Sequence, residues 1–130
     1  MAFYNANVKN IIVSDMNENG VKDVAEKING TAITSDVTNE KDVIRMVKTS
    51  TDKIDIFCSN VGIGGYEDFL KLSNDEWRKM IDTNLMSHIY GVRHVLPKML
   101  DRGSGYLVFT ASAAGLLSQL GSVTYSVTKH

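Results

Sequence analysis

The chain has 130 residues, of which 43% are hydrophobic, and its 14 Lys and Arg against 15 Asp and Glu give a net charge of -1 at pH 7. This length and hydrophobic content suit one globular domain, and the scattered charges of both signs make a nucleic acid or an acidic membrane surface an unexpected partner. Because no stretch approaches the roughly 18 apolar residues of a membrane span and the chain does not open with a secretory signal, we expect a cytoplasmic protein without a membrane segment.

The first part of the chain predicts a strand, a helix and a second strand. The short run NIIVS, over residues 10–14, is extended and stops at Asp15. The apolar residues that then recur at helical spacing are Val21, Val24, Ala25 and Ile28. Gly30 is placed to end this helix, and a second extended run, TAITS over residues 31–35, stops at Asp36.

A second helix and a third strand follow. Thr38 is the predicted N-cap of the helix, and the residues on its inner face are Val43, Ile44 and Val47. The strand is the run IDIFC over residues 54–58, which leads into a glycine-rich loop over residues 61–65. Cys58 is the only cysteine, so it cannot form an internal disulfide, and its apolar surroundings predict a buried thiol.

The longest predicted element is one helix from about Asn74 to Leu100, roughly 40 Å long at 1.5 Å per residue. Ser73 and Glu76 form a capping-box pattern at its start, and Pro97 marks a point where it could bend. The residues of its apolar stripe, which should face the core, are Trp77, Met80, Ile81, Leu85, Ile89, Val92, Leu96 and Met99.

A polar turn over residues 101–105 and a fourth strand, YLVFTA over residues 106–111, continue the alternation of helices and strands. Strands that are almost continuously apolar, each separated from the next by a helix, indicate a parallel sheet with helices on both faces. The sequence therefore predicts an α/β fold.

A polar side chain follows each of the four predicted strands. These residues are Asp15, Asp36, Asn60 and Ser112. Taken singly, each is better explained as a helix cap or a turn residue. In an open parallel sheet, however, ligands bind beyond the carboxyl ends of the strands, so four polar residues in corresponding positions favour a binding site there.

Asn84 lies three residues after Ile81 on the apolar stripe of the long helix, so its side chain should face inward. An unpaired buried amide costs about 1 to 3 kcal/mol, which predicts a bonding partner. A structural Asn that bonds a neighbouring backbone is as good an interpretation of this position as a catalytic one. His88, one turn further on, is expected to be a packing residue.

Tyr125 and Lys129 are four residues apart, so a helix that begins near Tyr125 would place both on one face. A free phenol has a pKa of about 10, and a neighbouring cation stabilises the phenolate by about 1.36 kcal/mol for each pKa unit shifted. Tyr125 would then serve as a general acid and base. The alternative is an ordinary exposed Tyr and Lys.

Ser112 lies thirteen residues before Tyr125, Lys129 four residues after it, and Asn84 within the motif Asp82-Thr83-Asn84-Leu85. With these residues the whole chain resembles the short-chain dehydrogenase/reductase family. The resemblance implies four catalytic residues. Tyr125 would exchange a proton with the substrate oxygen, Ser112 would hold that oxygen, and Asn84 would support a water-linked proton path. Lys129 would lower the pKa of Tyr125 and bond the nicotinamide ribose. Tyr125 itself would lie beside the cofactor.

The resemblance also implies residues that bind the cofactor. Asp36 and Val37 are similar to the pair that contacts adenine in this family. Asn60 and Gly62 belong to the sequence SNVG, which stands where the family usually has NNAG and differs from it at two of four positions. A carboxylate at Asp15 would accept hydrogen bonds from the adenosine ribose and repel a 2′-phosphate, which favours NAD over NADP.

The implied architecture is a partial Rossmann-type doubly wound parallel sheet, in which residues 1–130 form part of a dinucleotide-binding domain. In the family's sheet order 3-2-1-4-5-6-7, the chain supplies strands 2 to 5. The run GIGG at residues 62–65 follows the third predicted strand and lacks the helix-opening third glycine, so it is not the family's phosphate loop. The first strand with that loop is therefore expected outside the chain, and so are the last strands.

Without the central strand 1, the pairs 3-2 and 4-5 should stand about two strand spacings apart, roughly 9.6 Å, unless strand 2 pairs directly with strand 4. We therefore expect the isolated chain to be an incomplete and inactive fragment that is at best marginally stable and does not bind NAD tightly. The sequence leaves open whether a preceding segment carries a membrane anchor.

Two other protein classes share features with this sequence, a phospho-receiver signalling domain and a non-catalytic dinucleotide sensor. A phospho-receiver signalling domain requires an acceptor Asp after its third strand, where this chain has Ser59 and Asn60. A non-catalytic dinucleotide sensor is disfavoured by the intact Ser112, Tyr125 and Lys129. The substrate is a small alcohol or ketone, of which steroid, retinoid, sugar and fatty-acyl compounds all stay open, and the resemblance implies a homodimer or homotetramer.

Overall fold

The computed structural model describes residues 2–50, 53–65, 68–117 and 121–130. Contacts within the chain define two compact units, Met1–Asp52 and Lys53–His130, and each is described by itself. The elements of the first unit are α1 Ala2–Asn5, β1 Ile12–Asp15, α2 Glu18–Lys27, β2 Thr31–Thr34 and α3 Glu40–Thr49. Those of the second unit are β3 Ile56–Ser59, η1 Phe69–Lys71, α4 Asn74–Ile81, η2 Asp82–Met86, α5 Ser87–Asp101, β4 Tyr106–Phe109, η3 Ala113–Gly115 and α6 Val123–Lys129.

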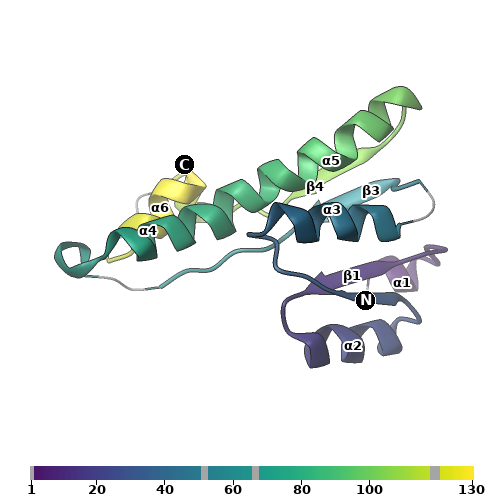
Figure 1. The fold of residues 1–130 in the computed structure, drawn as a ribbon, viewed down its shortest axis with the longest axis horizontal. Helices are drawn as coiled ribbons and strands as arrows, with labels where there is room; N and C mark the ends of the chain where they lie inside the picture. Colours follow the sequence, from purple (N-terminus) through teal and green to yellow (C-terminus); the bar gives the residue numbers. More distant parts are fainter. Residues whose placement is uncertain (1, 51–52, 66–67, 118–120) are drawn as a thin grey trace. The chain divides into compact units, whose positions relative to one another are not determined.

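Both strand pairs are parallel, as the sequence predicted (Figure 1). In the first unit β1 pairs with β2 from Ile12 opposite Thr31 to Asp15 opposite Thr34. In the second unit β3 pairs with β4 from Ile56 opposite Tyr106 to Ser59 opposite Phe109. Each pair is described within its own unit.

The helix α2 packs on β1 and β2 and buries Val21, Ala25 and Ile28. Val24, which shares the helical spacing of these residues, is 47% exposed. The helix begins at Asn17, whose side chain accepts a hydrogen bond from the Gly20 N–H at 3.0 Å. This cap satisfies one of the amides that the first turn leaves without an intrahelical partner.

The end of α2 corrects the role predicted for Gly30. The left-handed residue that terminates the helix is Asn29, with a φ of 50°, and the Gly30 N–H then bonds the Ala25 carbonyl at 2.8 Å. Gly30 is required for a different reason: a Cβ at this position would lie 2.7 Å from the backbone oxygen of Ile11.

The helix α3 begins one residue later than predicted. Its N-cap is Asn39, which accepts a hydrogen bond from the Lys41 N–H at 3.1 Å, and the prediction of Thr38 is wrong. The Thr38 hydroxyl is directed at the Asp36 carboxylate, to which both it and the Thr38 N–H donate. The inner face is as predicted, with Val43 and Val47 buried.

In the second unit the sheet β3–β4 is covered on one face by α5. The Phe57 ring packs so closely on Gly91 that a Cβ there would lie 2.6 Å from it. Because side chains alternate across a strand, Cys58 points to the opposite face, and its thiol is exposed. The prediction of a buried thiol is therefore wrong.

The long helix is continuous from α4 through η2 into α5, but it is not a uniform α-helix. The segment η2 is π-helical and is flanked by α4, which ends at Ile81, and α5, which begins at Ser87. A wider π turn shifts the register of the residues that follow it. Ser73 and Glu76 form both hydrogen bonds of the predicted capping box at the start of α4.

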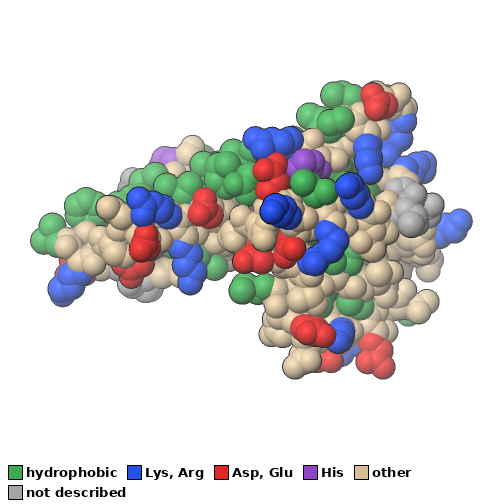
Figure 2. All heavy atoms as spheres, in the orientation of Figure 1, with side chains coloured by type: hydrophobic (Ala, Val, Ile, Leu, Met, Phe, Trp, Pro, Cys, Tyr) green, Lys and Arg blue, Asp and Glu red, His purple; other side chains and the backbone are tan. Residues whose placement is uncertain are grey.

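The apolar stripe predicted for this helix is wrong over its central part. Leu85 and Ile89 are 45% and 38% exposed, and Figure 2 shows apolar side chains over the long helix. Asn84 and Met99 are buried as predicted, and the other residues buried after Met80 are Thr83, Ser87, Gly91 and Val95. Small and polar residues occupy this face because β3 and α6 approach the helix closely. No helix in the described residues is long and apolar enough to cross a lipid bilayer.

Candidate active site

The helix α6 carries Tyr125 and Lys129 on one face, as their spacing predicted. Nζ of Lys129 lies 5.7 Å from the centroid of the Tyr125 ring, and both side chains are partly buried. With seven residues, α6 is too short to be stable alone, so its position depends on what it contacts in the second unit. It lies beside α4 and against η2 and η3 (Figure 1).

The glycine-rich loop over residues 61–65 runs along α6. Gly64 lies against the Tyr125 ring, since a Cβ at Gly64 would be 3.4 Å from Cδ2 of the ring. The buried hydroxyl of Ser122, which precedes α6, donates a hydrogen bond to the Gly65 carbonyl at 2.6 Å. The loop thus forms one side of the space around the phenol.

Asn84 joins this loop to α6 from the π-helical segment. Its side chain is 2% exposed, and it pairs with the backbone of Ile63: Oδ1 accepts the N–H at 2.8 Å, and Nδ2 donates to the carbonyl at 2.8 Å. Nδ2 also donates to Oγ1 of Thr128 at 3.0 Å. A Cβ at Gly62 would lie 3.6 Å from Asn84 Oδ1 and 3.7 Å from Lys129 Nζ. The Asn84 amide therefore lies near the Lys129 ammonium. It also bonds the backbone of a neighbouring segment, as expected for a structural Asn.

Ser112 lies at the start of η3, where its Oγ accepts a hydrogen bond from the Ala114 N–H at 3.2 Å. This short turn packs directly on the last turn of α6, because a Cβ at Gly115 would lie 2.4 Å from the backbone oxygen of Lys129. The structure thus brings the turn that carries Ser112 against the helix that carries the Tyr and Lys.

Asn60 follows β3 at the carboxyl end of the sheet. Its Oδ1 accepts a hydrogen bond from Oγ1 of Thr110 at 2.5 Å, which links the ends of β3 and β4. The side chain is exposed at the edge where parallel sheets bind ligands.

His88 is held by two neighbours, in agreement with its predicted packing role. Nδ1 bonds Oγ of Ser59 at 2.5 Å, and the ring meets Phe109 edge to face with centroids 5.7 Å apart. Burial, and then the positive charge of Lys129, lower the pKa of His88 below its ordinary value of 6.5. His88 is therefore neutral at pH 7.

In the first unit, Asp15 and Asp36 lie at the carboxyl ends of β1 and β2. Oδ1 of Asp15 accepts the Asn17 N–H at 2.8 Å, and Oδ1 of Asp36 accepts the N–H and the hydroxyl of Thr38 at 2.9 and 2.7 Å. Val37, which is partly buried, follows Asp36 in the turn before α3. Since the strands are parallel and in register, the two carboxyl groups share one edge of this sheet.

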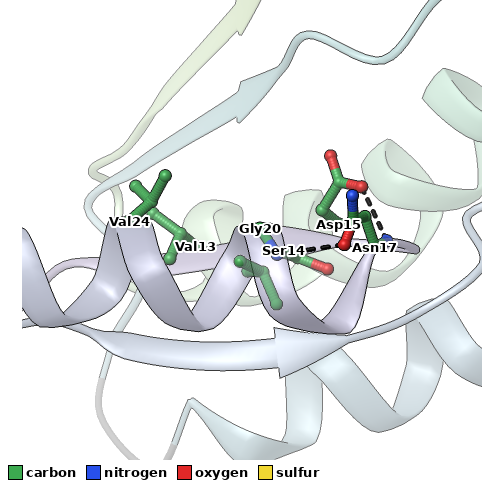
Figure 3. Close-up of a pocket in the computed structure, with 7 residues that line it drawn as sticks. Val13, Ser14, Asp15, Asn17, Gly20 and Val24 are labelled. Atoms are coloured by element: carbon green, nitrogen blue, oxygen red, sulfur yellow. Dashed lines mark hydrogen bonds between the residues drawn. The ribbon is translucent and has the colours of Figure 1, made fainter.

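An open hollow of about 360 Å³ borders Asp15 (Figure 3). Its lining residues come from β1 and α2 and are Val13, Ser14, Asp15, Asn17, Gly20, Val21 and Val24. The walls are apolar on the side of the valines and polar at the end of β1, where the carboxylate lies.

Sequence reasoning missed the contacts that fix the Asp36 turn. Oδ2 of Asp42 on α3 accepts the Asp36 N–H at 3.1 Å, and the same carboxylate forms an ion pair with Arg45 at 3.1 Å. Arg45 in turn donates to the Thr34 carbonyl at 3.1 Å. An acidic residue in the first turn of α3 was the available signal, because such residues bond nearby amides.

The structure brings Asn84, Tyr125 and Lys129 together around the loop. The turn η3, which begins next to Ser112, contacts α6 at Lys129. Sequence reasoning missed Thr128, although it lies three residues after Tyr125 and so on the same side of α6. It also missed Ile63, for which no signal exists, since only its backbone atoms take part.

The whole chain, residues 1–130, matches the family described as short chain dehydrogenase. An uncharacterised oxidoreductase of Listeria monocytogenes is 34% identical over 98 residues, which cover 73% of this chain and 40% of the relative. The 1-deoxy-11-beta-hydroxypentalenate dehydrogenase of Streptomyces arenae is 30% identical over 113 residues, which cover 82% of this chain and 40% of that protein.

Among solved structures, a short-chain dehydrogenase/reductase from Burkholderia phymatum in complex with NAD matches with a TM-score of 0.89 and 25% identity. The match covers 93% of this chain and 46% of that one. The chain thus spans less than half of the length of these relatives.

Proposed function

Because the chain belongs to the short-chain dehydrogenase family, we propose that it carries the catalytic residues of an NAD(P)-dependent oxidoreductase that interconverts a secondary alcohol and a ketone. The observation that carries this proposal is the convergence of Tyr125, Lys129 and Asn84 on the loop after β3, with the Ser112 turn packed against the same helix. The nicotinamide ring, when bound, would supply or accept the hydride.

Tyr125 is the proposed general acid and base. Its phenol would give a proton to a ketone oxygen as the oxygen becomes an alcohol, and would take that proton in the reverse direction. Lys129 places a positive charge 5.7 Å from the ring centroid. In a partly buried site, this charge stabilises negative charge that develops on the phenolic oxygen.

Ser112 is proposed to hold the substrate oxygen. A serine hydroxyl has one donor hydrogen and two acceptor lone pairs. Because Oγ accepts the Ala114 N–H in the observed turn, its own hydrogen is left to donate to a substrate oxygen. Asn84 is proposed to support the proton path by holding the loop and α6 at a fixed distance.

The donor and acceptor groups of each unit fit the parts of a nicotinamide dinucleotide that we assign to them. Asp15 uses one carboxylate oxygen for the Asn17 N–H, and its remaining acceptor sites suit two ribose hydroxyls beside the hollow. Asp36 and Val37 are assigned to the adenine, and Asn60 and Gly62 are assigned to the cofactor as well. Lys129, next to Tyr125, has the donor hydrogens that a nicotinamide ribose requires.

We propose NAD rather than NADP as the cofactor. The Asp15 carboxylate is exposed at the end of β1, and the residue that follows it is the neutral Met16. A negative charge there repels a 2′-phosphate, and a guanidinium or ammonium that would attract one is not adjacent in the sequence.

Replacement of Tyr125 by Phe tests the function. The test uses a full-length version, in which residues 1–130 are joined to the flanking segments of the Burkholderia phymatum enzyme. Tyr125→Phe should abolish NAD-dependent oxidation of secondary alcohols and leave NAD binding intact. The matched control is Tyr106→Phe, because Tyr106 is 73% exposed on β4 and should retain activity. Turnover that survives in Tyr125→Phe, or its absence in the unmodified full-length version, contradicts the proposal.

We further propose that the 130-residue chain alone is inactive and binds NAD weakly. The coverage of the relatives supports this, since the chain spans less than half of their length and the rest of those proteins lies outside the match. A cooperative thermal melt together with micromolar NAD affinity for the chain alone contradicts it. A homodimer or homotetramer and a cytoplasmic location stay predictions from the sequence.

A further inference from the structure

Thr128 lies between the two proposed catalytic residues of α6 and has both a donor and an acceptor contact. Its hydroxyl donates to the backbone carbonyl of Tyr125 at 2.9 Å and accepts from Nδ2 of Asn84 at 3.0 Å. The first contact lies within α6, and the second reaches 44 residues back along the chain to the π-helical segment. A single hydroxyl therefore links α6 to the long helix.

The Asn84 amide depends on this hydroxyl, because the amide is buried and has two hydrogens to donate. One hydrogen goes to the Ile63 carbonyl at 2.8 Å. The other has Thr128 Oγ1 at 3.0 Å and the sulfur of Met80 at 3.1 Å as its acceptors, and a thioether is a weak acceptor. Removal of the hydroxyl would leave a buried N–H with only the sulfur to bond.

The position of α6 decides where the phenol and the ammonium point. With seven residues, the helix has too few internal hydrogen bonds to hold its own orientation. Rotation of α6 about its axis would carry Tyr125 away from Gly64 and Lys129 away from Gly62, since both contacts lie on the face that meets the loop. The bond from Thr128 to Asn84 opposes that rotation, because Asn84 is itself fixed to the loop at Ile63.

We propose that Thr128 is a positioning residue, whose hydroxyl bonds Asn84 and thereby fixes the rotation of α6 that places Tyr125 and Lys129 against the loop. The chemical roles of these two residues rest on the proposed function, whereas the hydrogen-bonded link can be measured without turnover. The two ideas can therefore fail separately.

The experiment compares Thr128→Val, which keeps the shape and loses the hydroxyl, with Thr128→Ser, which keeps the hydroxyl. The probe is amide hydrogen exchange by NMR in the full-length version, because the isolated 130-residue chain is expected to be at best marginally stable. In Thr128→Val, the Ile63 N–H should exchange about tenfold faster, the effect expected for weakening one buried hydrogen-bond network. Nuclear Overhauser contacts between the Tyr125 ring and the Gly64 α-protons should weaken in the same variant.

Thr128→Ser should restore both signals. The Tyr106 N–H, which bonds the Asp55 carbonyl at 2.8 Å at the start of β4, should be unchanged in both variants. The proposal is overturned if Ile63 is unprotected in the unmodified full-length version, if Thr128→Val leaves both signals unchanged, or if Thr128→Ser behaves like Thr128→Val. Equal acceleration at Tyr106 also overturns it, because the hydroxyl would then act on general stability.

Discussion

Replacement of Gly115 by alanine should displace the turn that carries Ser112, and the structure gives the size of the displacement. A Cβ on Gly115 would lie 2.4 Å from the backbone oxygen of Lys129, about 1 Å closer than the 3.4 Å at which ordinary contacts begin. A backbone oxygen cannot rotate away as a flexible side chain can. The turn η3 must therefore move away from α6 by about 1 Å.

A movement of this size acts on the rate of the proposed reaction more than on cofactor binding. A misplacement of about 1 Å can cost on the order of 100-fold in rate, so kcat of the full-length version should fall by about that factor in Gly115→Ala. The KM for NAD should change less than kcat, because the residue carried by the displaced turn, Ser112, is assigned to the substrate oxygen and not to the cofactor. Overpacking of this kind typically costs about 1 to 3 kcal/mol of unfolding free energy as well.

The assay is steady-state NAD reduction, measured for Gly115→Ala, Ser112→Ala and the double variant. If Gly115 acts through Ser112, the double variant should be about as slow as the slower single variant, because the two changes remove the same interaction. Gly65→Ala is the matched control, since a Cβ there meets no atom within 4 Å. The reasoning is refuted if kcat of Gly115→Ala stays within about twofold of the unmodified enzyme, or if the two effects multiply in full.

Three further outcomes are expected. The pKa of His88 in the folded chain lies below its ordinary value of 6.5, so the unfolded chain binds the proton more tightly. The free energy of unfolding should therefore keep its full value above pH 6.5 and decrease as the pH falls below 6.5. NMR titration of the ring should give a midpoint below 6.5, and a midpoint above this value contradicts the burial argument. Asn39→Ala should cost about 1 kcal/mol through loss of the α3 cap, seen as faster exchange of α3 amides, and unchanged exchange would show that the cap is not needed. Asp15→Ser in the full-length version should reduce the preference for NAD over NADP in kcat/KM, and an unchanged ratio would remove Asp15 from the cofactor site.

The sequence by itself determined those features that depend on neighbours within one or two helical turns. The strand and helix alternation, the capping box at Ser73 and Glu76, and the shared face of Tyr125 and Lys129 all follow from covalent spacing. The parallel pairing followed too, because apolar strands separated by helices pack in only a few ways. The exact start of α3 was beyond this reasoning: Thr38 and Asn39 are both good caps, and in the structure the Thr38 hydroxyl turns to the Asp36 carboxylate while Asn39 caps the helix.

Only the tertiary structure decided which face of the long helix is buried. The apolar pattern favoured Leu85 and Ile89, but the close approach of Phe57 requires Gly91 on the packed face, and the π-helical segment shifts the register that a regular helix would keep. The partners of Asn84 were beyond sequence reasoning for a similar reason. Ile63 and Thr128 lie 21 and 44 residues away along the chain, and a hydrogen bond at that separation depends on how loop, helix and turn pack together. Composition and spacing select the elements and their chemistry, whereas the distances between them exist only once the chain has folded.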